Sequence, residues 1–353
     1  MELNTDIFPA LEQIPSPAFL VRDGKIIALN SGAQNRLFLP DQEVFPLLET
    51  GTDEYQSLVA GQLSLILRWN DISYDTTVIR EGQDTLFVLS GEYNQPELKA
   101  LSLAAQHLRD PLNSAILSVD QILPKLSDNE NTEMQQQLMQ INRSLYRLQR
   151  AIGNMADAAK CQGSAVSMEL RDAIQILAEI LKKASAFLEQ SGKKLQYSLP
   201  NESVYTLVNA DLLERSVLNL ISNAAKQTKD SSVHISVSLT GKSICITVQN
   251  SCDSKLTGNL FLRYLRQPDI EDGRNGIGLG LTFVRSCAFA HGGTVLTDLS
   301  MDDCFKITMT IKIQSSSSNM LRTPVQLPYD YAGGRDHTLL ELSDVLSSDI
   351  YNK

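Results

Sequence analysis

A heptad pattern between Leu101 and Ala159 constrains the fold of this chain more than any other feature. Apolar residues recur there alternately three and four positions apart, in two runs. The first run is Leu101, Ala105, Leu108, Leu112, Ala115, Val119, Ile122 and Leu126, and the second is Met134, Leu138, Ile141, Leu145, Leu148, Ile152, Met155 and Ala159. Pro124 and the polar residues 127–132 separate the runs, so the pattern predicts two helices folded into a hairpin. Because each apolar stripe is too narrow to be buried within one pair, we expect two hairpins to form a four-helix bundle in a homodimer.

Length and charge bound the class of protein. A chain of 353 residues suggests two to four domains. The net charge of −10 argues against a nucleic-acid surface, which needs a basic face. The five cysteines are odd in number and lack a C-x-x-C pair, so neither a disulfide scaffold nor a zinc site is indicated. The amino terminus lacks a signal-peptide pattern, and no apolar run is long enough for a membrane span. These features predict a soluble, cytoplasmic protein that does not bind membranes.

Residues 1–93 read as a small α+β domain. Two short apolar runs flank an Asp23-Gly24 turn, Asn30 can cap a short helix through Phe38, and three strand-like runs follow. This order resembles a PAS sensor domain, which implies a pocket for a signal or ligand. A dimerising module with a filled core fits the same pattern.

A mixture of helix-like and strand-like segments follows over residues 163–314. The expected elements are an amphipathic segment over 168–190, strands over 194–199 and 204–208, a helix over 211–226, a strand hairpin over 233–249, a helix over 282–290, and strands over 295–299 and 305–313. Residues 315–353 begin with a serine run that suggests a flexible linker. A short amphipathic helix over 339–346 docks on the body, docks on a partner, or belongs to a loosely ordered tail. The predicted class is therefore multidomain α+β.

Two asparagines on the helix over 211–226 are candidate ligands. Asn219 and Asn223 lie one helical turn apart on one face, and amide oxygens can coordinate a magnesium ion that phosphates mainly hold. Lys226 follows three residues later and could reach a phosphate. Asparagines at this spacing are also common as solvated polar residues.

Three alternating glycines precede the last predicted helix. Gly276, Gly278 and Gly280 would let the backbone approach a phosphate closely, and the start of a helix offers unpaired N–H groups. The spacing is not that of a dinucleotide-binding fingerprint. A glycine-rich loop without a ligand remains the alternative.

The order of these motifs is more specific than any one of them. Gln106-His107-Leu108-Arg109-Asp110-Pro111-Leu112 lies on the first heptad helix, the Asn-Leu-x-x-Asn-Ala-x-Lys helix follows, and the glycine motif and His-Gly-Gly-Thr come last. Over residues 95–313 this succession resembles the sensor histidine kinases of two-component signalling. The resemblance implies a dimerisation and histidine-phosphotransfer hairpin at 94–162 and a GHKL-type ATP-binding domain, an α/β sandwich, at 163–314.

The family's chemistry, ATP-dependent transfer of a phosphoryl group to a histidine and then to a response regulator, implies roles for individual residues. Magnesium would be held by Asn223, with support from Asn219. The remaining nucleotide contacts would come from Lys226, Asn250, Arg263, Gly276, Gly278 and Gly280.

Three residues depart from the family pattern. Aligned on Leu108–Leu112, the acceptor position holds Gln106, and His107 stands where an acidic residue belongs. The family's Asp-x-Gly-x-Gly motif appears as Asn250–Ser254, without its glycines, and Gln227 replaces a frequent aromatic. The sequence therefore supports two functions. One is a kinase with His107 as a displaced acceptor, and the other is a pseudokinase that signals by conformation or by docking onto a partner.

Overall fold

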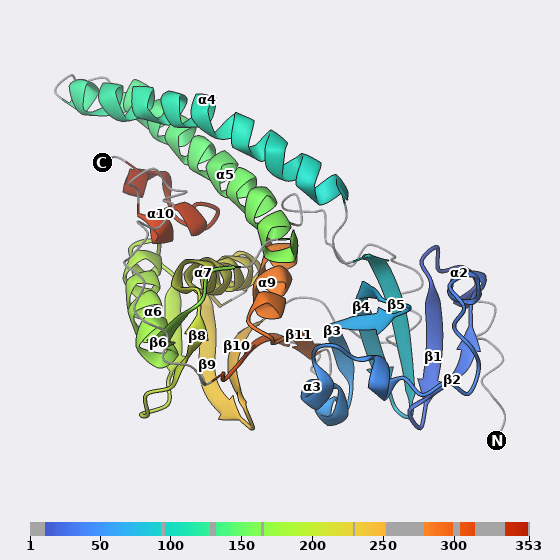
Figure 1. Ribbon diagram of the computed structural model, residues 1–353. Coiled ribbons are helices and arrows are strands. Elements are labelled where there is room, and N and C mark those ends of the chain that lie inside the picture. Colours follow the sequence, from blue (N-terminus) through green and yellow to red (C-terminus); the bar gives the residue numbers. More distant parts are fainter. Residues whose placement is uncertain are drawn as a thin grey trace.

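The computed structural model describes residues 11–92, 96–127, 132–163, 166–228, 230–251, 279–298, 304–314 and 336–351. Figure 1 shows a strand-rich amino-terminal unit, a long helical hairpin and an α/β domain, with the carboxy-terminal residues between the hairpin and that domain. Within the described residues no helix is both long and apolar enough to cross a membrane.

The amino-terminal unit is an antiparallel sheet with short helices. Its elements are β1 (Ala18–Arg22), β2 (Lys25–Leu29), α2 (Ser31–Asn35), η1 (Phe45–Leu47), α3 (Thr52–Ser57), β3 (Gly61–Trp69), β4 (Ile72–Glu81) and β5 (Asp84–Glu92). The Asn30 side chain caps α2 by accepting a hydrogen bond from the Ala33 N–H at 2.9 Å. The helix ends before the predicted Phe38, because Leu37 adopts a left-handed conformation with φ 66°.

Aromatic rings fill the interior of this unit. Phe19 lies 5.0 Å from Phe38 and 5.1 Å from Phe87, measured between ring centroids. Trp69 stacks on Phe38, and Tyr55 meets Phe87 edge-on. These rings belong to one apolar core of the unit.

Two long helices occupy the region of the heptad pattern. They are α4 (Pro96–Ser127) and α5 (Thr132–Gly163). Contrary to the expectation that Pro124 helps to end the first helix, α4 continues through Pro124 to Ser127. The hairpin register is fixed by two side-chain hydrogen bonds of 3.2 Å, Gln149 to Asn113 and Asn142 to Asp120.

The heptad residues divide into two sets. On α4, Ala105, Leu112 and Val119 are buried, whereas Leu108 and Ile122 are about half exposed. Among the described residues of the hairpin, the exposed large apolar residues are Leu103, Leu108, Leu117, Ile122, Met134, Ile141 and Leu148. Half of the apolar stripe is thus left uncovered by the described residues of this chain.

The α/β domain is a sheet with helices packed against it (Figure 1). Its elements are β6 (Glu169–Asp172), α6 (Ala173–Gln190), β7 (Lys194–Ser198), β8 (Tyr205–Val208), α7 (Ala210–Gln227), β9 (Ser232–Thr240), β10 (Ser243–Ser251), α9 (Leu279–Ala290), β11 (Val295–Asp298) and β12 (Cys304–Lys312). The interpretation of 168–190 as one amphipathic segment is wrong at its start, where β6 pairs with β8. Asp172 separates strand from helix because its carboxylate accepts hydrogen bonds from the first N–H groups of α6.

The two sheets are joined edge to edge. Strand β11 pairs antiparallel with β3, with Val295 opposite Ser64 and Thr297 opposite Gln62. One ten-stranded sheet results, in the order β2-β1-β5-β4-β3-β11-β12-β10-β9-β7. Gly61 makes the approach possible, since its φ is +122° and a Cβ there would lie 2.5 Å from the Thr297 carbonyl oxygen.

The carboxy-terminal residues also pack against the body. The short helix α10 (His337–Glu341) and the turn η2 (Ser348–Tyr351) contact α5, and α10 also contacts α6 and α7. Of the alternatives predicted for residues 339–346, docking on the body is therefore the one that the structure shows.

Candidate functional site

Helix α7 carries the candidate asparagines, and its start is held by two other side chains. The Asn209 side chain caps the helix by accepting from the Leu212 N–H at 3.0 Å. The Asn209 N–H donates to His291 Nε2 at 3.1 Å, and His291 Nδ1 lies 2.7 Å from the Cys287 carbonyl oxygen. Nδ1 therefore carries the proton, and His291 is a neutral link between α9 and α7. Burial lowers the pKa of His291, although the Cys287 carbonyl acts in the opposite direction.

Asn219 is fully buried, and protein groups use both ends of its amide. Its oxygen accepts from Arg150 at 2.7 Å and from Asn154 at 3.3 Å, both on α5. Its nitrogen donates to the Arg215 carbonyl and to Glu341, each at 2.9 Å. Asn219 therefore joins three elements of this chain, α5, α7 and α10.

Asn223 lies one turn further along α7 and is only partly buried. Its side chain makes no hydrogen bond within the described residues. A Cβ on Gly280, in the first turn of α9, would lie 2.9 Å from Asn219 Oδ1 and 3.8 Å from Asn223 Nδ2. The absence of a side chain at Gly280 thus lets the start of α9 approach both asparagines.

Lys226 is the last of the candidate residues along α7. Its ammonium forms an ion pair with Asp344, beyond α10. Burial lowers the pKa of Lys226, and the neighbouring Arg150 and Arg147 act in the same direction, while Asp344 opposes them. The cation that the sequence assigned to a phosphate is therefore paired with a carboxylate of the same chain.

Asn250 lies near the end of β10 with its side chain buried. Its nitrogen donates to the Ser251 carbonyl oxygen at 3.0 Å. Its oxygen, Oδ1, has no hydrogen-bond partner among the described residues. A buried amide oxygen without a donor is costly, so this position fits a ligand that donates one hydrogen bond.

The remaining predicted residues are not part of this constellation. Arg263, Gly276 and Gly278 lie outside the described residues. His107 is exposed on α4. Extended along the hairpin, the register of the Gln149–Asn113 and Asn142–Asp120 hydrogen bonds places His107 level with the turn of α5 that follows Asn154. Gln106 lies in α4, but its side chain is outside the described set.

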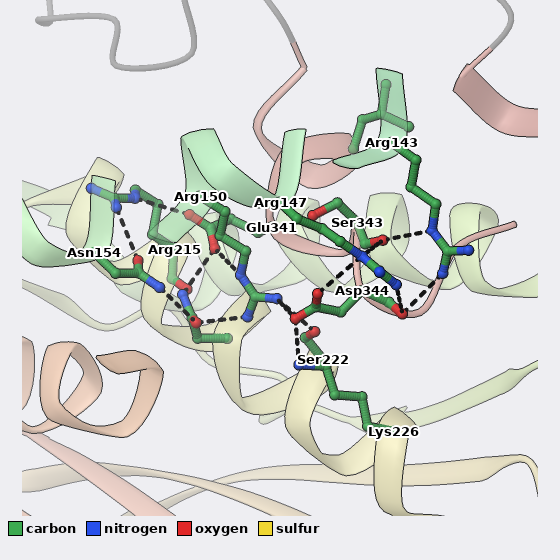
Figure 2. Close-up of polar contacts among 12 residues, drawn as sticks. Arg143, Arg147, Arg150, Asn154, Arg215, Ser222, Lys226, Glu341, Ser343 and Asp344 are labelled. Atoms are coloured by element: carbon green, nitrogen blue, oxygen red, sulfur yellow. Dashed lines mark hydrogen bonds and ion pairs between the residues drawn. The ribbon is translucent and has the colours of Figure 1, made fainter. Parts of the chain in front are cut away.

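Sequence reasoning missed a cluster of charged residues beside α7, which Figure 2 shows. Arg150 contacts Glu341 at 3.0 Å, Asp344 at 2.7 Å and the Ser222 hydroxyl at 3.0 Å. Arg215 is fully buried and contacts the other oxygen of Glu341 at 3.1 Å. Its guanidinium also lies 4.6 Å from the centre of the Phe283 ring. The sequence did hold one signal for this cluster, which is Glu341 inside the apolar run Leu339–Leu342. A carboxylate that is buried with such a run needs a buried cation as its partner.

Comparison with known proteins fits this geometry. Residues 208–315, which include α7, β10 and α9, match the family described as histidine kinase-, DNA gyrase B- and HSP90-like ATPase. These residues form a domain of that ATPase family. The ATPase domain thus carries Asn219, Asn223, Lys226 and Asn250.

Relatives extend the similarity beyond the ATPase domain. An adaptive-response sensory kinase, SasA, of Gloeothece citriformis is 25% identical over 264 residues, which cover 69% of this chain and 66% of that protein. The sensor protein KdpD of Escherichia coli is 24% identical over 317 residues, 87% of this chain and 33% of KdpD. The chain is therefore related to sensor histidine kinases, and it spans just under two thirds of the first relative and a third of the second.

Among solved structures, full-length ShkA in complex with AMPPNP superposes with a TM-score of 0.45 at 18% identity, over 62% of this chain and 47% of ShkA.

Proposed function

We propose that this chain is a histidine kinase-like signalling protein that uses ATP and Mg²⁺ to phosphorylate a histidine and passes the phosphoryl group to a response regulator. One observation carries the proposal. In a domain of this ATPase family, the buried oxygen of Asn250 has no hydrogen-bond partner among the described residues, and the partly exposed side chain of Asn223 lies beside the first turn of α9. These groups offer the acceptors that a magnesium nucleotide requires.

The residues would divide the binding of the nucleotide. Asn250 Oδ1 would accept a hydrogen bond from the adenine amino group. Asn223 would hold Mg²⁺, which when bound neutralises charge on the phosphates. Lys226 and the first turn of α9, at Gly280, would face the phosphates. Arg263, Gly276 and Gly278 remain predicted contributors.

The phosphoryl acceptor in this proposal is His107. Its exposed imidazole would attack the γ-phosphorus in line, ADP would leave with the bridging oxygen, and the ring would lose its remaining N–H proton to solvent. The phosphoimidazole would then donate the group to an aspartate of a response regulator. The protein's own contribution is positioning and charge neutralisation.

The same proposal assigns the domains. Residues 1–93 would be a PAS-like input domain, 94–162 the dimerisation and phosphotransfer hairpin, 163–314 the ATP-binding domain, and 315–353 a linker with a carboxy-terminal helix. The exposed half of the hairpin stripe, with Leu108 51% and Leu148 52% exposed, supports a homodimer through a four-helix bundle.

A pseudokinase is the second candidate, and Gln106 favours it. An amide cannot accept a phosphoryl group as imidazole does, and His107 is rotated by about 100° from the acceptor position on the helix. In this case the protein would keep the dimer and the nucleotide site and would act through a partner.

Phosphorylation separates the two candidates. The full chain is incubated with γ-labelled ATP and Mg²⁺. Acid-labile label that His107→Gln abolishes, and that His234→Gln on the exposed face of β9 retains, supports the kinase. Label that appears only after Gln106→His supports the pseudokinase. Failure of the wild-type chain to bind MgATP in calorimetry, or binding that Asn223→Ala and Asn250→Ala leave unchanged, would contradict the nucleotide site on which both candidates rest.

A further inference from the structure

The carboxy-terminal segment, defined as residues 336–351, is anchored in the core by apolar side chains. Its buried members are Leu339, Leu340, Leu342, Leu346 and Tyr351. The Tyr351 ring meets Tyr146 of α5 edge-on at 5.0 Å, and its hydroxyl donates to the Leu339 carbonyl oxygen at 2.9 Å. The segment is therefore held in one place by packing, before any charge is considered.

Glu341 is fully buried in this segment, and its carboxylate is shared by two cations. Arg150 contacts one oxygen at 3.0 Å and Arg215 contacts the other at 3.1 Å. Asn219 donates to the same carboxylate at 2.9 Å. A buried carboxylate is tolerated only with such partners, so the position is built for an anion.

Asp344 continues the negative charge towards the end of α7. It contacts Arg150 at 2.7 Å and Arg147 at 3.3 Å, and it forms the ion pair with Lys226. Burial alone would raise the pKa of Asp344, but Arg150, Lys226 and Arg147 outweigh it, so the pKa lies below the ordinary value. Asp344 is therefore ionised at neutral pH.

Backbone oxygens complete the row. The carbonyl of Ser343 accepts from Arg143 at 3.1 Å and from Arg147 at 3.3 Å. The carbonyl of Asp344 accepts from the same two arginines at 3.1 Å each. The segment thus presents a line of oxygen atoms to a line of cations, as Figure 2 shows. Phosphate oxygens are the other groups that such guanidinium forks bind.

An open pocket adjoins this contact. It has a volume of about 440 Å³ and is lined by Arg147, Lys193 and Lys226 together with Asp344, Ala225 and Val345. Three of these side chains are cationic, and Asp344 is the single acid. An anion in this pocket would compete with Asp344 for Lys226.

We propose that the carboxy-terminal segment is an intramolecular ligand of the ATPase domain: its Asp344 carboxylate holds Lys226 in place of a nucleotide phosphate, and its Glu341 carboxylate holds the neighbouring Asn219. The docked segment inhibits nucleotide binding, and a magnesium nucleoside triphosphate displaces it. This inference rests on the proposed function, because that function assigns Lys226 to the phosphates.

The test compares MgATP affinity in the full chain. Asp344→Asn removes one carboxylate from Lys226 and keeps the shape of the side chain. Asp349→Asn removes the same charge from an exposed position of the same segment. We expect Asp344→Asn to bind MgATP about tenfold more tightly in calorimetry, because the variant lacks the carboxylate that competes with a phosphate for Lys226. We expect Asp349→Asn to match the wild type. Equal or weaker binding by Asp344→Asn would overturn the inference.

Hydrogen exchange of the wild-type chain gives a second readout that needs no variant. We expect saturating MgATP to raise the exchange rate of the amides of residues 337–346 at least tenfold. Unchanged exchange, with MgATP bound, would overturn the inference and leave the proposed function standing. If neither the wild type nor Asp344→Asn binds MgATP, the proposed function fails and the inference fails with it.

Discussion

Replacing Glu341 by Gln tests the energetic role of the buried carboxylate. The substitution keeps the side-chain size but removes the charge between Arg150 and Arg215 and turns two acceptor oxygens into one. An NH₂ group then faces a guanidinium donor in a fully buried position. Breaking one side of a buried ion pair costs about 3 to 5 kcal/mol, and we expect a loss in this range. The loss in free energy of unfolding cannot exceed the free energy of undocking the carboxy-terminal segment, because an undocked segment no longer makes the unfavourable contact.

Urea unfolding followed by far-UV circular dichroism measures this loss. A change of about 3 kcal/mol moves the midpoint by roughly 1 M or more for the usual slopes. Asp349→Asn is the matched control, and its exposed position predicts a change within about 0.5 kcal/mol. Hydrogen exchange at residues 337–346 then distinguishes local release from global destabilisation. If Glu341→Gln and Asp349→Asn give the same midpoint and the same exchange, the carboxylate does not stabilise the fold as argued.

Three further predictions concern other contacts. Burial lowers the pKa of His291 below its ordinary 6.5, so the unfolded chain binds the proton first as the pH falls. The free energy of unfolding should therefore decrease below about pH 6.5, until the lowered pKa of the folded state is passed. In urea midpoints measured from about pH 8 to 5, His291→Gln should lose this pH dependence, whereas His234→Gln should keep it. Gly280→Ala should destabilise the domain by about 1 to 3 kcal/mol in thermal unfolding, since its Cβ would lie 2.9 Å from Asn219 Oδ1, and an unchanged Tm would contradict the close approach. Leu148→Lys, on the exposed stripe of α5, should convert a dimer to a monomer in sedimentation, while Ser144→Lys, an exposed polar position on α5, should not.

Elements with a local signal were predictable from the sequence. The heptad spacing predicted α4 and α5, a helix was predicted over 211–226 where α7 lies, and alternation with a turn predicted β9 and β10. The errors are also local, since a capping Asp172 inside an amphipathic run and a left-handed Leu37 moved two helix boundaries.

Contacts between distant residues left little trace in the sequence. Arg150 and Glu341 are 191 positions apart, and their ion pair follows no periodicity. The family resemblance assigned Asn219, Asn223 and Gly280 to the same nucleotide, and in the structure Gly280 approaches both asparagines. It did not show that the amide of Asn219 is already used by α5 and α10, or that Asp344 pairs with Lys226. The roles of these residues in nucleotide binding remain predictions.

The pairing of β3 with β11 has a consequence for how the chain can be divided. A sheet edge with free N–H and C=O groups is a template for aggregation, and here each unit covers one edge of the other. Cutting the chain between the amino-terminal unit and the ATPase domain would expose two such edges at once. Fragments that separate β3 from β11 should therefore be less soluble than the whole chain, even where each retains its own apolar core.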